Sequence, residues 1–264
     1  MKIDHKDSFK DFGDQFSKDS KIDEYFGSLE LLQNIIKPFN LNQIKNKLIC
    51  EVGIGSGRIT NNLLKFSPLK ITGIEPSEAI KIAKKNISSD KVNYLNIKGE
   101  EIRHNSEFDY VFSIGVIHHI PNYKLVLKNI NRSLKPGGKF IVWVYGKEGN
   151  ELYLLIFNNL RRITIYLPDL SLKILSNFLC VLTYIYGFLC KFIRLPMQKY
   201  FLNFFNKFSF EKKSYIIFDQ LNPSFAKYFT KKEFEEELRD ANFQIDHIEH
   251  RLNYSYTAIC SKRI

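Results

Sequence analysis

The sequence predicts an α/β fold with a mostly parallel sheet and helices on both of its faces. Two observations predict it. Short apolar runs alternate with helical segments between residues 48 and 145, and a glycine-rich loop joins the first such run to the first helix after it. Strands that alternate with helices at this spacing form right-handed β-α-β crossovers. Ligands of such sheets bind at the carboxyl ends of the strands.

The alternating elements can be placed one after another along the chain. The first helix is expected to stop at the Lys37–Pro38 step, because the residue before a proline avoids the helical conformation. The turn at 135–138 contains a proline and two glycines and precedes the fifth strand. We predict strands over 48–52, 69–74, 92–97, 108–113 and 139–145, and helices over 22–36, 58–65, 78–85 and 123–134.

The chain is predicted to close with one helix and two antiparallel strands. Thr230 and Glu233 have the spacing of a capping box, in which a hydroxyl and a carboxylate satisfy each other's backbone amides. The helix that they begin extends to Ala241. Strands over 243–250 and 255–261 follow, and their short connection predicts a hairpin at the edge of the sheet.

Residues 151–214 interrupt the alternation with a helical, aromatic insertion. Nine Lys or Arg against three Asp or Glu give it +6 of the net charge of +11. Residues 174–190 carry no charge, which reaches the lower limit of a membrane span, about 17 to 25 residues. Three interpretations follow: a lid over an apolar acceptor pocket, a helix on a membrane surface, or a span. Polar Ser176, Asn177 and Thr183 weigh against the span.

Length and composition favour one domain with an insertion. The 264 residues are 44% hydrophobic and 25% charged, which excludes disorder, and a single core still grows at this size. Four widely spaced cysteines predict neither a metal site nor disulfides, so a cytoplasmic location is expected. We predict a helical flap over 1–40, a cofactor-binding core over 41–150, the insertion over 151–214, and a segment over 215–264 that completes the core.

The strongest chemical signal is the run Glu51-Val-Gly53-Ile-Gly55-Ser-Gly57, which follows a strand and opens a helix. A dinucleotide fingerprint would require a glycine at position 58, where Arg58 stands, so the spacing argues against an NAD-dependent oxidoreductase. Glycines allow the backbone to approach a ligand without collisions from Cβ atoms.

This pattern resembles motif I of the class I S-adenosylmethionine (SAM)-dependent methyltransferases, of the type 11 or 12 kind. The resemblance covers about residues 45–145 and returns in the C-terminal helix and hairpin. It implies a Rossmann-like seven-stranded sheet with an antiparallel last strand, and SAM as the cofactor. The cofactor contacts that it implies are Glu51, Gly53, Gly55 and Gly57 near the methionyl part, Glu75 at the ribose, Glu100 or Glu101 at the adenine, and Ser113 and Ile114 beside the cofactor.

Two histidines at the end of the fourth strand are the candidate catalytic residues. His119 is the first candidate for a general base and His118 the second, because imidazole titrates near neutrality. The alternative is a histidine that only bonds to the backbone. On the acceptor side, Asp219, Asn222 and Tyr228 are polar residues beside the apolar insertion, and they are the candidate substrate-binding residues.

Missing motifs shape the expected acceptor. The chain has neither the Pro-Pro motif of amino-nitrogen methyltransferases after the fourth strand nor a Pro-Cys nucleophile, which argues against a nucleic-acid partner. We therefore expect a small or amphipathic acceptor, such as a lipid, quinone, sugar-linked or polyketide-like compound. Under the second interpretation of the basic insertion, residues 151–214 also contact a membrane surface. The alternative is a protein that binds SAM without catalysis, or that docks on membranes with the same scaffold.

Overall fold

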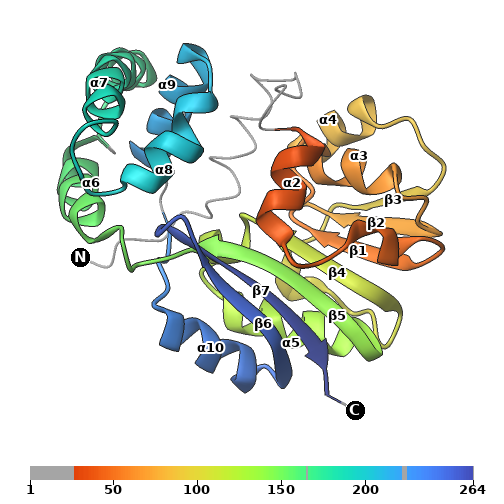
Figure 1. Cartoon of the computed structure of the whole chain (residues 1–264). Coiled ribbons are helices and arrows are strands. Elements are labelled where there is room, and N and C mark those ends of the chain that lie inside the picture. The colour runs from red at the N-terminus through yellow and green to blue at the C-terminus, as the bar shows by residue number, and fades with distance from the viewer. Residues whose placement is uncertain (1–26, 165, 222–224, 264) are drawn as a thin grey trace.

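The computed structural model describes residues 27–164, 166–221 and 225–263. Seven strands form one sheet in the order β3-β2-β1-β4-β5-β7-β6, as Figure 1 shows. Strands β1 to β5 are parallel, and β7 runs antiparallel to both β5 and β6. The strands are β1 Leu48–Val52, β2 Lys70–Ile74, β3 Val92–Leu95, β4 Phe108–Ile114, β5 Leu134–Tyr145, β6 Phe243–Arg251 and β7 Ser255–Lys262.

Helices bury both faces of this sheet. One core cluster lies where α5 and α10 pack on the sheet, and a second lies where α2 and α3 pack on it. A sheet covered on both faces requires strands that are apolar almost throughout, which is the pattern of β1 and β4. The helices around the sheet are α2 Leu29–Ile36, α3 Arg58–Leu64, α4 Ala79–Asn86, α5 Tyr123–Ser133 and α10 Lys231–Asp240.

The predicted fold class is confirmed, with small differences at the ends of elements. Strand β5 begins at Leu134 rather than at 139, because Leu134 already pairs with Phe108 before a bulge shifts the register. The predicted capping box is present: Thr230 Oγ1 accepts from the Glu233 amide at 3.1 Å, and Glu233 Oε2 accepts from the Thr230 amide at 2.8 Å. The first helix begins at Leu29, and most of the flap predicted over 1–40 lies outside the described residues.

The insertion between β5 and α10 forms a helical layer beside the sheet (Figure 1). Its helices pack around buried side chains of their own, among them Leu172, Phe205, Ile217 and Leu221. This separate core explains why the insertion can stand away from the sheet and leave space between the two. Its elements are α6 Glu151–Thr164, α7 Asp169–Leu189, α8 Gln198–Asn203, the short 3-10 helix η4 Phe205–Lys207 and α9 Phe210–Leu221.

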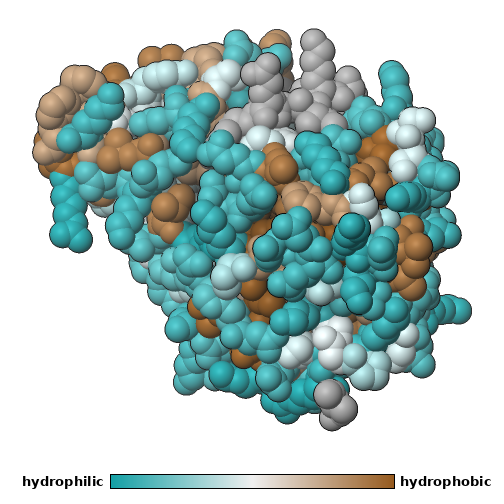
Figure 2. All heavy atoms as spheres, turned by 45° about the vertical axis from the view of Figure 1, so that its right-hand side comes forward, coloured by the Kyte–Doolittle hydropathy of each residue, from teal (hydrophilic) through white to brown (hydrophobic). Residues whose placement is uncertain are grey.

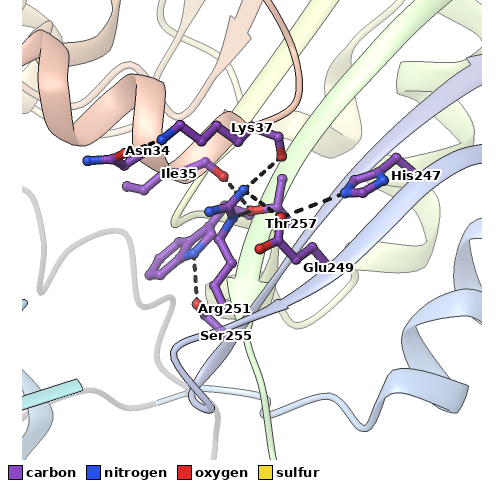
Figure 3. A network of polar contacts seen from close by, with 9 residues as sticks. Asn34, Ile35, Lys37, His247, Glu249, Arg251, Ser255 and Thr257 are labelled. Carbon is purple, nitrogen blue, oxygen red and sulfur yellow. Dashed lines mark hydrogen bonds and ion pairs between the residues drawn. The ribbon is translucent and has the colours of Figure 1, made fainter. Parts of the chain in front are cut away.

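A polar network attaches α2 to the closing hairpin (Figure 3). Arg251 Nη2 donates to the Lys37 carbonyl at 2.8 Å, and Arg251 Nε donates to Thr257 Oγ1 at 2.9 Å. Thr257 Oγ1 in turn donates to the Ile35 carbonyl at 2.5 Å. The network fixes the carboxyl end of α2 against β6 and β7, and so holds Leu31 and Ile35 at the rim of the cavity described next.

Candidate active site

A cavity of about 430 Å³ lies at the carboxyl ends of β1, β2, β4 and β5, between the sheet and the insertion. This volume is in the range of small-molecule sites. The cavity has two halves of different chemistry. The half on the sheet carries the glycine loop and three carboxylates, whereas the half on the insertion is lined mainly by tyrosine and phenylalanine side chains.

The glycine loop shapes the first half. Gly53 and Gly55 both line the cavity with positive φ angles, +82° and +52°, which side chains rarely adopt. At Gly53 a Cβ atom would lie 2.4 Å from Val116 Cγ2. The amides of Gly53 and Ile54 both donate to the Ile74 carbonyl, which joins the loop to β2. The loop therefore needs glycine for its own packing as well as for the approach of a ligand.

Glu75 connects this loop to the segment after β2. Its Oε2 accepts from the Gly55 amide at 3.0 Å, and its Oε1 accepts from the Ser77 amide at 3.1 Å and the Ser77 hydroxyl at 2.6 Å. A carboxylate offers about four acceptor positions, and Glu75 lines the cavity, so it retains capacity for a ligand hydroxyl. Glu75 is thus both a structural bridge and a candidate ribose contact.

Glu51 lies at the end of β1 and lines the same half of the cavity. It is almost fully buried, and Thr60 Oγ1 donates a short hydrogen bond to its Oε2. Burial raises the pKa of Glu51 to about 8, although the Thr60 hydrogen bond and the charge of Arg58 act in the opposite direction. The carboxyl therefore keeps its proton at neutral pH until a positive charge arrives beside it.

Of the other expected cofactor contacts, some line the cavity and others lie outside it. Glu100 and Ile114 line the cavity. Glu101 is exposed instead and accepts from the Lys98 amide at 2.7 Å, so it caps a turn. Ser113 is buried and donates to the Val52 carbonyl at 3.3 Å. Gly57 is the N-cap residue of α3 and packs on Ile87, which a Cβ atom would approach to 2.5 Å. These three residues support the site from outside the cavity.

The two candidate bases, His119 and His118, differ in their access to the cavity. His119 lines the cavity, and its Nδ1 donates to the Phe225 carbonyl at 3.2 Å, which makes Nε2 the acceptor of the neutral ring. Burial lowers the pKa of His119 to about 4, so the ring is neutral above about pH 5. His118 is fully buried and does not line the cavity; its ring packs 4.0 Å from that of Tyr145, between centroids. The expectation that His118 could serve as a base is corrected, because its ring lies behind the cavity wall.

The acceptor half contains residues that sequence reasoning missed. Tyr145 ends β5, Tyr153 and Arg161 lie on α6, and Gln220 lies on α9. Together with the predicted Tyr228 they form one hydrogen-bonded cluster. These residues lie far apart in the sequence, so the cluster could not be predicted from it. Only the position of Tyr145 at the end of its strand indicated that this residue could reach the site. Of the other two predicted substrate residues, Asn222 and the side chain of Asp219 lie outside the described residues.

Comparison with known proteins gives three results. A family model described as a methyltransferase domain matches residues 50–142. Among solved structures, one in a complex of the Haloferax volcanii Trm112 methyltransferase activator with a putative methyltransferase has a TM-score of 0.61 at 13% identity, covering 98% of this chain and 99% of that one. A putative S-adenosylmethionine-dependent methyltransferase from Listeria monocytogenes has a TM-score of 0.56 at 16% identity, covering 91% and 100%.

Two curated relatives share one printed name, tRNA U34 carboxymethyltransferase. The relative from Nautilia profundicola is 32% identical over 122 residues, which are 45% of this chain and 40% of the relative. That from Campylobacter jejuni is 29% identical over 144 residues, 51% and 49% of the two chains. The chain thus spans less than half the length of these relatives. Their name overturns two expectations from the sequence, the small or amphipathic acceptor and the absence of a nucleic-acid partner.

Proposed function

From the premise that residues 50–142 are a class I SAM-dependent methyltransferase domain, we propose that the chain transfers a methyl group from SAM to a nucleotide of tRNA in the cytoplasm. The observation that carries the acceptor is the match to relatives named for tRNA U34, at up to 32% identity among those described above. The absent Pro-Pro and Pro-Cys motifs speak only against amino-nitrogen and cytosine C5 chemistry, and they leave other atoms of a nucleotide open.

The residues of the first cavity half fit SAM. The ligand is positively charged at its sulfur and amino group and carries ribose hydroxyls, and this half presents three carboxylates, Glu51, Glu75 and Glu100. We assign Glu75 to the ribose hydroxyls, Glu51 with Gly53 and Gly55 to the methionyl part, and Glu100 to the adenine. When bound, the cofactor supplies a methyl group on a sulfonium, which is ready for in-line displacement.

The second half fits a nucleobase that has left its stack. Enzymes that modify a base extrude it into a pocket lined by aromatic side chains. Tyr145 and Tyr228 stack there with ring centroids 5.2 Å apart, and His119 lies 5.7 Å from Tyr145. His119 Nε2 is then placed to accept a proton from the reacting position. The net charge of +11 favours the approach of the tRNA phosphates.

The test is transfer of labelled methyl groups to an unmodified tRNA transcript. We expect label in the tRNA that nuclease digestion releases, at a rate independent of the protonation of His119 above about pH 5. His119→Ala should slow transfer by about 10²- to 10⁴-fold, the usual contribution of a general base. The same variant should bind S-adenosylhomocysteine like the wild type. Binding of S-adenosylhomocysteine without any transfer to tRNA would overturn the proposal.

A second observation is an exposed apolar surface on α7, which bears on the location of the protein in the cell. Six large apolar side chains form a stripe along one face of α7 at spacings of three and four residues, each between 52% and 72% exposed. They are Leu170, Ile174, Phe178, Val181, Ile185 and Phe188. In Figure 2, brown and tan side chains gather at the upper left, where Figure 1 places the insertion helices. Contiguous apolar surface of this kind marks an interaction site.

We propose that this stripe rests on an anionic membrane surface. Residues 170–210 contain five Lys or Arg and no Asp or Glu, so their charge matches anionic headgroups. The same charges would repel in a pairing of two copies. Helix α7 is long and apolar enough to cross a membrane. The helix, however, also packs on α9, where Ser214 donates to Asn177 and the Lys213 ammonium lies 3.9 Å from the Tyr184 ring centroid. Lying in the interface preserves this packing, whereas spanning would break it.

Co-sedimentation with liposomes measures this contact. Phe178→Glu places one acid in the middle of the stripe, at a position 60% exposed, and we expect binding to phosphatidylglycerol vesicles to fall at least tenfold. The matched control is Leu69→Glu, which introduces the same charge at a position 59% exposed on the core domain. Equal binding of all three proteins, or binding to neutral phosphatidylcholine vesicles that matches the anionic ones, would contradict the proposal.

A further inference from the structure

Hydrogen bonds fix the orientation of the Gln220 side-chain amide. Its side-chain oxygen accepts from the Tyr153 hydroxyl at 2.5 Å, from the Tyr228 hydroxyl at 3.1 Å and from Arg161 Nη2 at 3.3 Å. Because a guanidinium has donors and no acceptor, the atom of Gln220 that faces Arg161 must be the oxygen. The amide group therefore cannot turn over without placing two donors against each other.

The opposite side of the same amide faces the ligand space. Gln220 lines the cavity, and its Nε2 donates to the Tyr145 hydroxyl at 3.3 Å. An amide nitrogen carries two hydrogens, so one donor position is left for a ligand. Gln220 thus presents a fixed donor, and its oxygen is already saturated by three partners.

Arg161 holds this arrangement through its contacts with Gln220, and its side chain also hydrogen-bonds to Tyr228. Its Nε donates to the main-chain carbonyl of Gln220 at 2.6 Å, and its Nη1 donates to Asn158 at 3.3 Å. No carboxylate of the described residues forms an ion pair with it. The guanidinium does not itself line the cavity. Arg161 is therefore a positioning residue that donates hydrogen bonds to both the main chain and the side chain of Gln220.

The surroundings define the class of ligand. The three carboxylates that line the cavity all belong to the sheet half, so the insertion half offers aromatic faces together with the amide donor of Gln220. A flat ring would be held by the tyrosine faces, and a carbonyl oxygen on its edge would accept from Gln220. An exocyclic amino group at the same place would meet the donor of Gln220 with a donor of its own.

We propose that Gln220, oriented by Arg161, is the specificity-determining residue that selects a carbonyl-bearing pyrimidine, uracil, over its amino counterpart, cytosine. This inference rests on the proposed function, since a nucleotide acceptor is what brings a pyrimidine to the cavity. It goes beyond that proposal by naming the residue that distinguishes the bases and the residue that fixes its direction.

The single tryptophan of the chain provides the measurement. Trp143 lines the cavity, so its fluorescence reports on ligands there. With S-adenosylhomocysteine present, we expect uridine to quench it with at least tenfold higher affinity than cytidine, because a buried donor that finds no acceptor on the ligand costs binding free energy. Gln220→Glu should abolish this preference, since an oxygen replaces the donor while the shape is retained.

A matched pair of variants on α6 tests the positioning role. Arg161→Met should reduce the uridine preference to less than threefold, whereas Arg162→Met, at the exposed neighbouring position, should retain it. Both variants should bind S-adenosylhomocysteine like the wild type, which shows that they are folded. In transfer assays Arg161→Met should raise KM for tRNA more than it lowers kcat.

Each result has a separate meaning. Equal quenching by uridine and cytidine, no quenching by uridine, or an unchanged preference in Gln220→Glu would overturn this inference. If tRNA were nevertheless labelled, the proposed function would stand without it. Uridine preference that depends on Gln220 and Arg161, with no label transferred to tRNA, would support the inference and refute the tRNA acceptor.

Discussion

Replacing Gly55 with arginine is expected to abolish detectable binding of S-adenosylhomocysteine, a loss of more than 100-fold in affinity. Gly55 lines the cavity, and its amide donates to Glu75 Oε2. A long side chain there would occupy the space of the ligand and bring a cation toward the ammonium group of the ligand. Its φ of +52° adds strain of about 1 kcal/mol or more for a residue with a Cβ atom. Calorimetric titration of the purified variant measures the effect.

The control must reproduce the strain without filling the cavity. Gly137 has a φ of +71°, and a Cβ atom there would meet no atom within 4 Å. Gly137→Arg therefore carries the same kind of backbone strain and the same added charge in the exposed turn before the main part of β5. We expect it to bind S-adenosylhomocysteine within threefold of the wild type. Equal affinities of Gly55→Arg and the wild type would show that the cofactor does not occupy this half of the cavity.

The second large effect is a pH dependence of stability that comes from Glu51. The folded protein keeps the proton on Glu51 up to about pH 8, whereas the unfolded chain releases it near the ordinary value of 4.5. Between these values the folded state binds more protons than the unfolded state, so the free energy of unfolding falls as pH rises. A full proton of difference corresponds to about 1.4 kcal/mol per pH unit. Below pH 4.5 this contribution to the slope disappears.

Glu51→Gln removes the titrating group and keeps the shape and the oxygen that accepts from Thr60. We expect urea unfolding of this variant to show a flatter dependence on pH between 5 and 8, and a greater stability than the wild type at pH 9. Glu236→Gln is the control, since that carboxylate is exposed on α10. Parallel curves for wild type and Glu51→Gln across this range would mean that Glu51 is ionised in the free protein.

The two halves of the cavity are built by different parts of the fold, which face each other. The sheet half is built from the loops that end β1, β2 and the third strand, so its carboxylates converge because parallel strands end at one edge. The insertion half closes over them from the other side and is tied back to the sheet through the Gln220 and Tyr145 contact. The reacting groups can therefore meet only where insertion and sheet face each other.

The cofactor half could be predicted from the sequence because its residues act through local spacing. Gly53 and Gly55 stand directly after a strand, Glu75 ends the next one, and Glu100 follows the third. Regular β-α-β alternation brings such positions together whatever the rest of the chain does. The same alternation predicted the sheet, and each predicted strand is present with its ends shifted by a few residues.

Which of the predicted site residues face the cavity becomes visible only in the folded protein. Ser113 and His118 have plausible positions at the end of β4, yet their side chains turn into the core. Glu101 turns outward to cap a turn, and Glu100 beside it lines the cavity. Neighbouring residues in irregular segments have no fixed period, so their directions depend on packing that no local pattern encodes.

The acceptor half of the cavity could not be predicted from the sequence, because it depends on long-range packing. Tyr145, Arg161 and Gln220 come from a strand and two helices, 75 residues apart between the first and the last. Helix periodicity predicts which residues share a face, but it does not predict which face of α6 meets which face of α9. The fold and the place of the cofactor can be predicted from the residues alone, because both follow from local spacing repeated along a sheet. The acceptor site can be found only in the folded protein, because it is made by long-range packing of an insertion that has no regular repeat.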